Sequence, residues 1–121
     1  MSHWLLVALG GALGAMARYS AGLIVAGGGW PWATLLVNLC GAIGFGVVIT
    51  LLGKQVLHPS LQPLLIAGFF GAFTTFSTFS WELFKFIEQH AWLTAISYSA
   101  GSVVLCLMGM FIGIGLGRIA G

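Results

Sequence analysis

Four long apolar stretches limit what this chain can fold into. They cover residues 4–25, 32–52, 61–84 and 92–116, and a helix needs about 20 mainly apolar residues to cross a bilayer core of roughly 30 Å. Charged residues occupy 5% of the 121 positions, against about 25% in typical soluble domains. The sequence therefore predicts an all-α integral membrane protein with four transmembrane helices in a single domain, residues 1–121.

The same composition excludes several classes of function. The formal net charge is +2 without a clustered basic face, so we expect no nucleic-acid partner. Aspartate is absent, and Glu82 and Glu88 lie at or beyond the end of the third stretch, which leaves no embedded carboxylate for cation or proton-coupled transport. Hydroxyl groups without a buried base lack activation, so we expect no enzyme. Cys40 and Cys106 lie in mid-stretch and are interpreted as small packing residues.

The third stretch contains an unusual polar segment, GFFGAFTTFSTFSWE, at residues 68–82. Its five hydroxyl side chains are Thr74, Thr75, Ser77, Thr78 and Ser80. Its phenylalanines recur at every third position, at Phe70, Phe73, Phe76 and Phe79. Glycine and hydroxyl residues weaken a helix, so we predict that the third helix is broken at 71–75. Backbone groups freed at this depth are tolerated where they coordinate something.

Polar residues of the other stretches add donors to this segment. Asn38 is the sole strongly polar side chain of the second stretch, and Tyr98 and Ser102 share one helical face of the fourth. Arg18 lies near the far end of the first, where its side chain can extend toward the headgroups. Neutral hydrogen-bond donors, the positive edges of the phenylalanine rings and the guanidinium of Arg18 all attract negative charge, so this set favours a small anion as ligand. The alternative is that the phenylalanines are core or lipid-facing and the hydroxyls bond carbonyls one turn earlier.

Positive charge is balanced between the two sides of the predicted bundle. Lys54 and Arg118 fall on the side of the termini, and Arg18 and Lys85 fall on the other. The positive-inside rule then selects no orientation, and a chain inserted both ways can pair with its inverted copy. The fourth stretch also carries glycines at four-residue intervals, Gly109, Gly113 and Gly117. Such a seam suits a second copy or the chain's own helices, and both alternatives stay open.

The segment GFFGAFTTFSTFSWE strongly resembles the signature of the Fluc (CrcB) fluoride channels. GGALGAMARY in the first stretch and TLLVNLCGAIG in the second resemble the companion motifs of that family, in the same order. The resemblance implies an antiparallel, dual-topology homodimer with two anion pores along the subunit interface. It also implies passive export of toxic fluoride across the bacterial cell (inner) membrane.

Specific residues carry the roles that the resemblance implies. The expected anion-pore residues are Asn38, Phe76, Ser77, Thr78, Phe79, Tyr98 and Ser102. Arg18 is expected near a vestibule. The main-chain carbonyls of Gly71 and Thr74 are expected to hold one structural sodium ion at the two-fold axis of the dimer.

Two other functions fit a small four-helix membrane protein. The first is a dual-topology drug or metabolite transporter, from which the lack of a buried acid distinguishes this chain. The second is a structural or assembly protein, in which the glycine seams serve only as docking faces.

Overall fold

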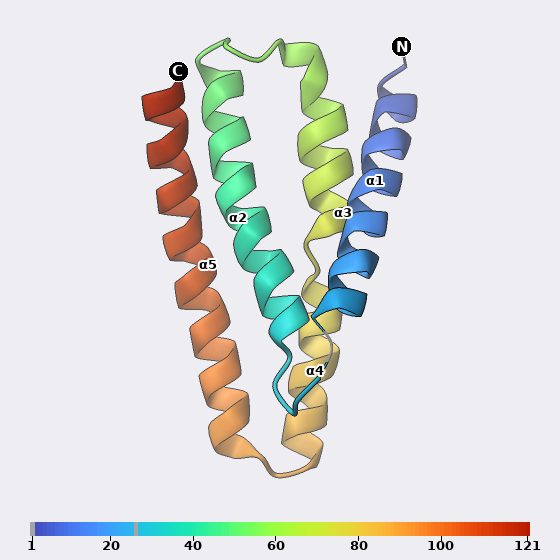
Figure 1. Ribbon diagram of the computed structural model, residues 1–121, viewed down its shortest axis with the longest axis vertical. Coiled ribbons are helices and arrows are strands. Elements are labelled where there is room, and N and C mark those ends of the chain that lie inside the picture. The colour runs from blue at the N-terminus through green and yellow to red at the C-terminus, as the bar shows by residue number, and fades with distance from the viewer. Residues whose placement is uncertain (1, 26) are drawn as a thin grey trace.

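The computed structural model describes residues 2–25 and 27–121, and within them four helical spans are long and apolar enough to cross a membrane. They are α1 (His3–Ile24), α2 (Trp32–Gly53), a composite third span (Pro59–Glu88) and α5 (Trp92–Ala120). The spans alternate in direction, with both termini and the connector between the second and third spans at one end (Figure 1). The predicted all-α membrane fold with four spans is confirmed. The third and fourth spans each end four residues later than predicted.

The third span is assembled from unlike segments. In order, they are η1 (Pro59–Leu61), a π-helical segment η2 (Pro63–Phe70), a single turn α3 (Gly71–Phe73) and α4 (Phe76–Glu88). Between α3 and α4 the backbone is extended, with ψ of 156° at Thr74 and φ and ψ of −148° and 120° at Thr75. The predicted break at 71–75 is therefore confirmed, and Figure 1 shows it as a gap in the coiled ribbon.

Glycines let α1 lie directly against the first half of the third span. A Cβ atom at Gly10 would collide with the carbonyl oxygen of Leu64, and one at Gly14 with the carbonyl oxygen of Phe69. Small residues give membrane helices close van der Waals contact, which replaces the hydrophobic drive available in water. This packing fixes the segment that precedes the break.

The glycine seam of the last span faces the chain's own second helix. A Cβ atom at Gly113 would collide with the carbonyl oxygen of Ile43, and one at Gly117 would lie 3.0 Å from the carbonyl oxygen of Val47. Of the two alternatives left open by the sequence, contact within the chain is the one observed. The seam fixes α5 against α2 and leaves other faces for a partner.

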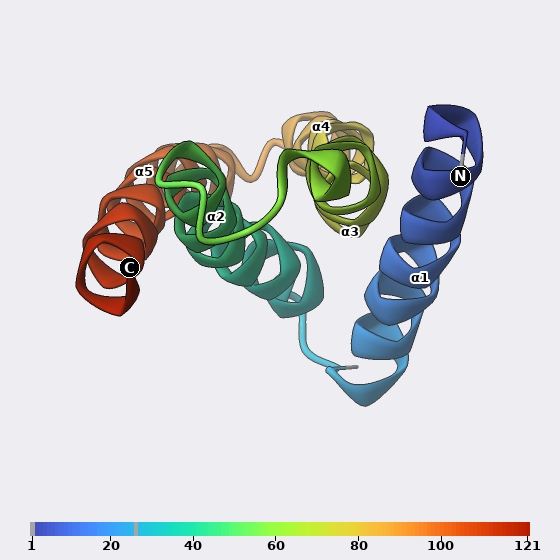
Figure 2. The same cartoon turned by 90° about the horizontal axis from the view of Figure 1, so that it is seen from above.

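Seen from above, the spans form an open arc. Their order is α5, α2, the third span and α1 (Figure 2). The core cluster joins Leu35, Phe79 and Tyr98, with Trp30 and Phe86 among the residues packed on it. It lies at the end occupied by α4, and elsewhere the arc leaves long apolar surfaces exposed.

A matched pair of glycine substitutions tests the α2–α5 contact. Gly113→Ala inserts a methyl group against the Ile43 carbonyl, and we expect a loss of about 1–3 kcal/mol in unfolding free energy because the helices must separate. Gly115→Ala is the control, since nothing lies within 4 Å of its Cβ position, and it should leave the melting temperature unchanged or slightly raised. Thermal unfolding in detergent measures both. Equal melting temperatures would contradict the packing described.

Candidate functional site

Asn38 holds the break open from the neighbouring helix. Its Nδ2 donates to the carbonyl oxygen of Thr75 at 3.0 Å, and the Thr75 backbone N–H donates to Asn38 Oδ1 at 2.8 Å. The side-chain amide thus satisfies both main-chain polar groups of one extended residue, as a neighbouring β-strand would. Since such groups are costly when unpaired in an apolar setting, Asn38 stabilises the interrupted conformation.

Arg18 reaches the break from the other side. It lies six residues before Ile24, the last residue of α1, and its Nε donates to the carbonyl oxygen of Ala72 at 3.0 Å. The side chain thus bonds a carbonyl at the break that the interrupted helix leaves without its usual partner, and its extension toward the headgroups stays a prediction. α1 and α2 each supply one polar side chain to the interruption in the third span.

The hydroxyl groups of the segment divide between two uses. Thr74 Oγ1 donates to the carbonyl of Phe70 at 2.8 Å, and Ser80 bonds the carbonyl one turn earlier, as the alternative interpretation expects. Thr75 behaves differently, since its Oγ1 accepts from the Thr78 backbone N–H at 3.2 Å and so caps α4. Hydrogen bonds from the hydroxyl groups to nearby main-chain groups therefore accompany the end of α3 at Thr74 and cap the start of α4 at Thr75.

Three carbonyls at the break have no hydrogen bond from any residue that the structure describes. They belong to Gly71, Phe73 and Thr74, whereas Ala72 is taken by Arg18. In an unbroken helix they would accept from amides four residues later, but the Thr75 amide is held by Asn38. Main-chain carbonyls are ligands for hard cations. The predicted sodium ligands, Gly71 and Thr74, are thus two of three free acceptors, and their role stays a prediction.

An open groove of about 380 Å³ lies beside the break. We call it the break groove. Four of the seven predicted pore residues line it, namely Asn38, Phe76, Phe79 and Ser102. Ser102 is 8% exposed, and its hydroxyl has no partner among the described residues. The groove therefore combines a bound amide, a free buried hydroxyl and two aromatic rings.

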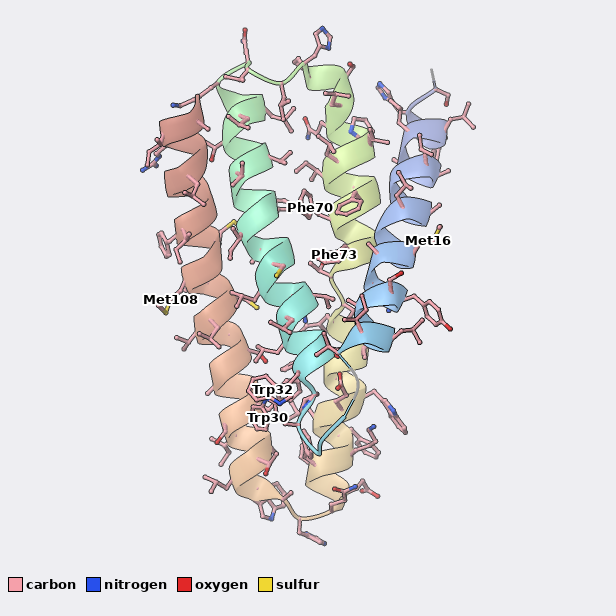
Figure 3. The ribbon with its side chains drawn as sticks, viewed as in Figure 1. Met16, Trp30, Trp32, Phe70, Phe73 and Met108 are labelled. Carbon is pink, nitrogen blue, oxygen red and sulfur yellow. The ribbon has the colours of Figure 1, made fainter. Side chains whose placement is uncertain are left out.

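The phenylalanine series is divided by the break. Phe70 meets Phe45 of α2 at a ring-centroid distance of 6.2 Å, and Phe73 stacks on Phe69 at 5.6 Å. Both side chains project from the segment above the break (Figure 3). Phe76 and Phe79, on α4, lie 5.7 Å apart and face the groove instead. The single stripe predicted for a continuous helix is therefore replaced by two separate pairs.

The two rings at the groove differ in exposure. Phe76 is 78% exposed, whereas Phe79 is 9% exposed. Phe79 packs on Tyr98, with ring centroids 5.0 Å apart, and Tyr98 is 1% exposed. Phe79 is thus packed in the core of its own chain, while the Phe76 ring beside it stays largely exposed.

The remaining predicted residues lie outside the break groove. Arg18 and Thr78 line a second groove of about 350 Å³ between α1, α2 and α4. Thr75 lines both grooves. Ser77 Oγ lies 3.4 Å from Thr75 Oγ1, and the buried Tyr98 lines neither groove. The structure thus brings together part of the predicted set, and the role of each residue stays a prediction.

Glu82 lies deeper in the third span than the sequence pattern predicts. The third stretch was ended at residue 84, but α4 continues to Glu88, so Glu82 lies within the span and is half-buried. Thr34 Oγ1 donates to Glu82 Oε1 at 2.5 Å, and the Tyr98 hydroxyl lies 3.5 Å from the same oxygen. The spacing in the sequence could have placed Glu82 correctly, because Glu82 follows Phe79 by three positions and therefore shares its helical face.

The Asn38–Thr75 pairing can be tested by amide exchange. In Asn38→Ala the Thr75 N–H loses its acceptor, and we expect its hydrogen-exchange rate to rise about ten-fold or more, as the loss of one buried hydrogen bond implies. Asn38→Asp keeps an oxygen at the Oδ1 position but loses the Nδ2 donor to the Thr75 carbonyl, so its protection should lie between those of wild type and Asn38→Ala. Exchange measured by NMR checks both variants. An unchanged rate in Asn38→Ala would show that the pairing does not hold the break.

Comparison with known proteins places the chain in a family. A family model described as "CrcB-like protein, Camphor Resistance (CrcB)" matches residues 5–114. A protein of Chloroflexus aurantiacus named "Fluoride-specific ion channel FluC" is 43% identical over 122 residues, covering 98% of this chain and 97% of that protein. Proteins of the same name from Nitratidesulfovibrio vulgaris and Hahella chejuensis are 42% and 43% identical, covering 98% and 97% of this chain and 99% and 95% of their own lengths. The chain belongs to the CrcB family.

Proposed function

We propose that this protein is a passive, fluoride-selective channel that lets the anion leave the cytoplasm. The observation that carries the proposal is the break groove, which gathers Asn38, Phe76, Phe79 and Ser102 around an interrupted helix. Relatives named as fluoride-specific ion channels are 43% and 42% identical to this chain over nearly their whole length. The names of the relatives and the polar groups of the groove both support this function.

The polar atoms left free in the groove suit an anion. Asn38 Nδ2 carries two hydrogens, and one of them is given to Thr75. The second remains for a ligand, as does the unpartnered hydroxyl of Ser102. The positive edges of the Phe76 and Phe79 rings extend this donor set. These groups replace part of the tight hydration shell of fluoride at short range, whereas a larger anion is poorly accommodated.

Simple electrostatics supplies the direction of flow. Hydrofluoric acid crosses a membrane as a neutral molecule and ionises in a near-neutral cytoplasm, which traps the anion. An inside-negative potential then favours exit by about 2.3 kcal/mol for each 100 mV. No coupled energy source is required, so a passive pore in the bacterial inner membrane is sufficient.

An antiparallel homodimer would complete the pore. The arc of helices leaves the break groove open on one side, and Phe76 stands 78% exposed at its edge. A second, inverted copy is the partner that suits both this surface and the balanced charges. Lys54 and Arg118 lie at the end of the termini, and the opposite half holds Lys85 and the inward-turned Arg18. Two such copies would enclose two grooves.

The free carbonyls at the break would then meet across the two-fold axis. We propose that Gly71 and Thr74 of both copies bind one structural sodium ion. Their freedom from hydrogen bonds within the described residues supports this assignment, because main-chain carbonyls are ligands for hard cations.

One observation favours the drug or metabolite transporter as a second candidate. Glu82 is half-buried within the third span, and such a carboxylate is what proton-coupled transport of a cation requires. A transporter of that kind moves substrate in response to a pH gradient alone, whereas the passive channel moves fluoride with its own gradient. The assembly-protein alternative is weakened because the α5 glycine seam is occupied by α2.

Substitution at the aromatic pair tests the proposed pore. We expect Phe76→Ile or Phe79→Ile to lower fluoride efflux from proteoliposomes at least 100-fold, because an aliphatic group offers no positive ring edge. Phe84→Ile is the control, since Phe84 is 50% exposed, stacks on Trp81 and lies outside the groove. A fluoride electrode measures efflux, and crosslinking verifies the dimer. Efflux at the wild-type rate in both pore variants would remove these rings from the pathway.

Cation exchange tests the sodium site. Purified protein transferred from sodium to an equal concentration of N-methylglucamine should lose thermal stability, because the paired carbonyls then face one another without a cation. Potassium serves as a size control and should restore less of the thermal stability than sodium does. A melting temperature that is the same in all three cations would contradict the assignment.

A further inference from the structure

One face of α5 lines the break groove with a serine, a cysteine and a methionine. Ser102, Cys106 and Met110 follow at four-residue intervals, and all three line the groove. Side chains four apart on a helix are neighbours, with Cβ atoms about 5–6 Å apart. Cys106 and Met110 thus lie on consecutive turns of α5 beside one groove.

Two sulfur ligands at this spacing have a defined chemical preference. Thiolate and thioether groups are soft donors and select soft cations such as Cu⁺, and Ag⁺ shares that preference. Monovalent ions of this class are satisfied by two ligands in a line, so no third protein ligand is needed. Both side chains are unbranched, and Met110 has three rotatable bonds with which to adjust.

The Ser102 hydroxyl, which the proposed function assigns to the anion, lies on the same helical face as these two side chains. The Ser102 hydroxyl lies one turn from Cys106, is more than nine-tenths buried and has no partner among the described residues. A buried hydroxyl in this condition is costly unless a ligand or water completes it. It lies beside the two sulfur-bearing side chains, on the same face of the same helix.

We propose that Cys106 and Met110 form a site for a soft monovalent cation, and that its occupation closes the break groove to anions. When Ag⁺ binds, a sulfur–silver bond forms as the thiol releases its proton to water, and no atom is oxidised or reduced. Cys106 was interpreted from the sequence as a packing residue, but it lines the groove. The closure, unlike the binding, rests on the proposed function.

The other cysteine provides a matched control. Cys40 is exposed on α2 and does not line the break groove. Cys40→Ser therefore leaves Cys106 as the sole thiol, and Cys106→Ser leaves Cys40. Met110→Leu removes the second sulfur at nearly constant volume and keeps both thiols.

Efflux in the presence of silver tests closure. Proteoliposomes in chloride-free nitrate buffer receive micromolar silver nitrate, and inhibition is scored for each variant as the ratio of fluoride rates with and without Ag⁺. We expect at least ten-fold inhibition of wild type and Cys40→Ser, reversed by dithiothreitol, and less than two-fold inhibition of Cys106→Ser. Met110→Leu should need about ten times more Ag⁺. Inhibition of Cys106→Ser equal to that of wild type, or none in any protein, would overturn the proposal.

Direct binding separates failure of this site from failure of the proposed function. Titration calorimetry of the detergent-solubilised protein with silver nitrate needs no fluoride flux. We expect Cys40→Ser to bind one Ag⁺ per chain at least ten times more tightly than Cys106→Ser, with Met110→Leu lowering the affinity. Equal affinities in the two single-cysteine proteins would overturn the site even if wild type conducts fluoride. The expected binding in a protein without fluoride flux would support the site and contradict the channel.

Discussion

The rest of the structure depends on the pairing of the Asn38 amide with the main chain of Thr75. Two hydrogen bonds of 3.0 Å and 2.8 Å satisfy a residue that has left the helix in mid-span. Without them the apolar surroundings would favour a continuous helix, in which every backbone group is bonded internally. The break in turn directs Phe76 and Phe79 toward the groove and leaves carbonyls free. One amide on α2 thus links backbone geometry to the proposed anion path.

The open arc gives this break its functional setting. Glycine contacts fix α1 and α5 at the two flanks of the arc, so the outer helices are rigid supports. The centre, where the third span is interrupted, remains uncovered, and Phe76 projects from it. A second copy could cover the exposed surface around the interrupted third span, while the outer helices of each copy hold it in place. The proposed pores, sodium ion and silver site all lie along this one unfinished surface.

Much of the fold follows from local sequence, and most of the site does not. The span count and the broken third helix were predictable because apolar length and the density of glycine and hydroxyl residues are local properties. The Asn38 and Arg18 contacts join residues 37 and 54 positions apart, which no periodicity encodes. Glu82 was misplaced because hydropathy falls before α4 ends. The α5 seam was ambiguous, since spacing shows a face but not what covers it.

The proposed channel offers fluoride a selective path through the break groove. The most direct test is anion efflux from proteoliposomes of the wild-type protein, with the potential set by potassium and valinomycin. A fluoride-selective passive channel should give rapid loss of fluoride and at least a 100-fold slower loss of chloride, without any pH gradient. Equal rates for the two anions, or no efflux of fluoride from vesicles that contain folded protein, would contradict it.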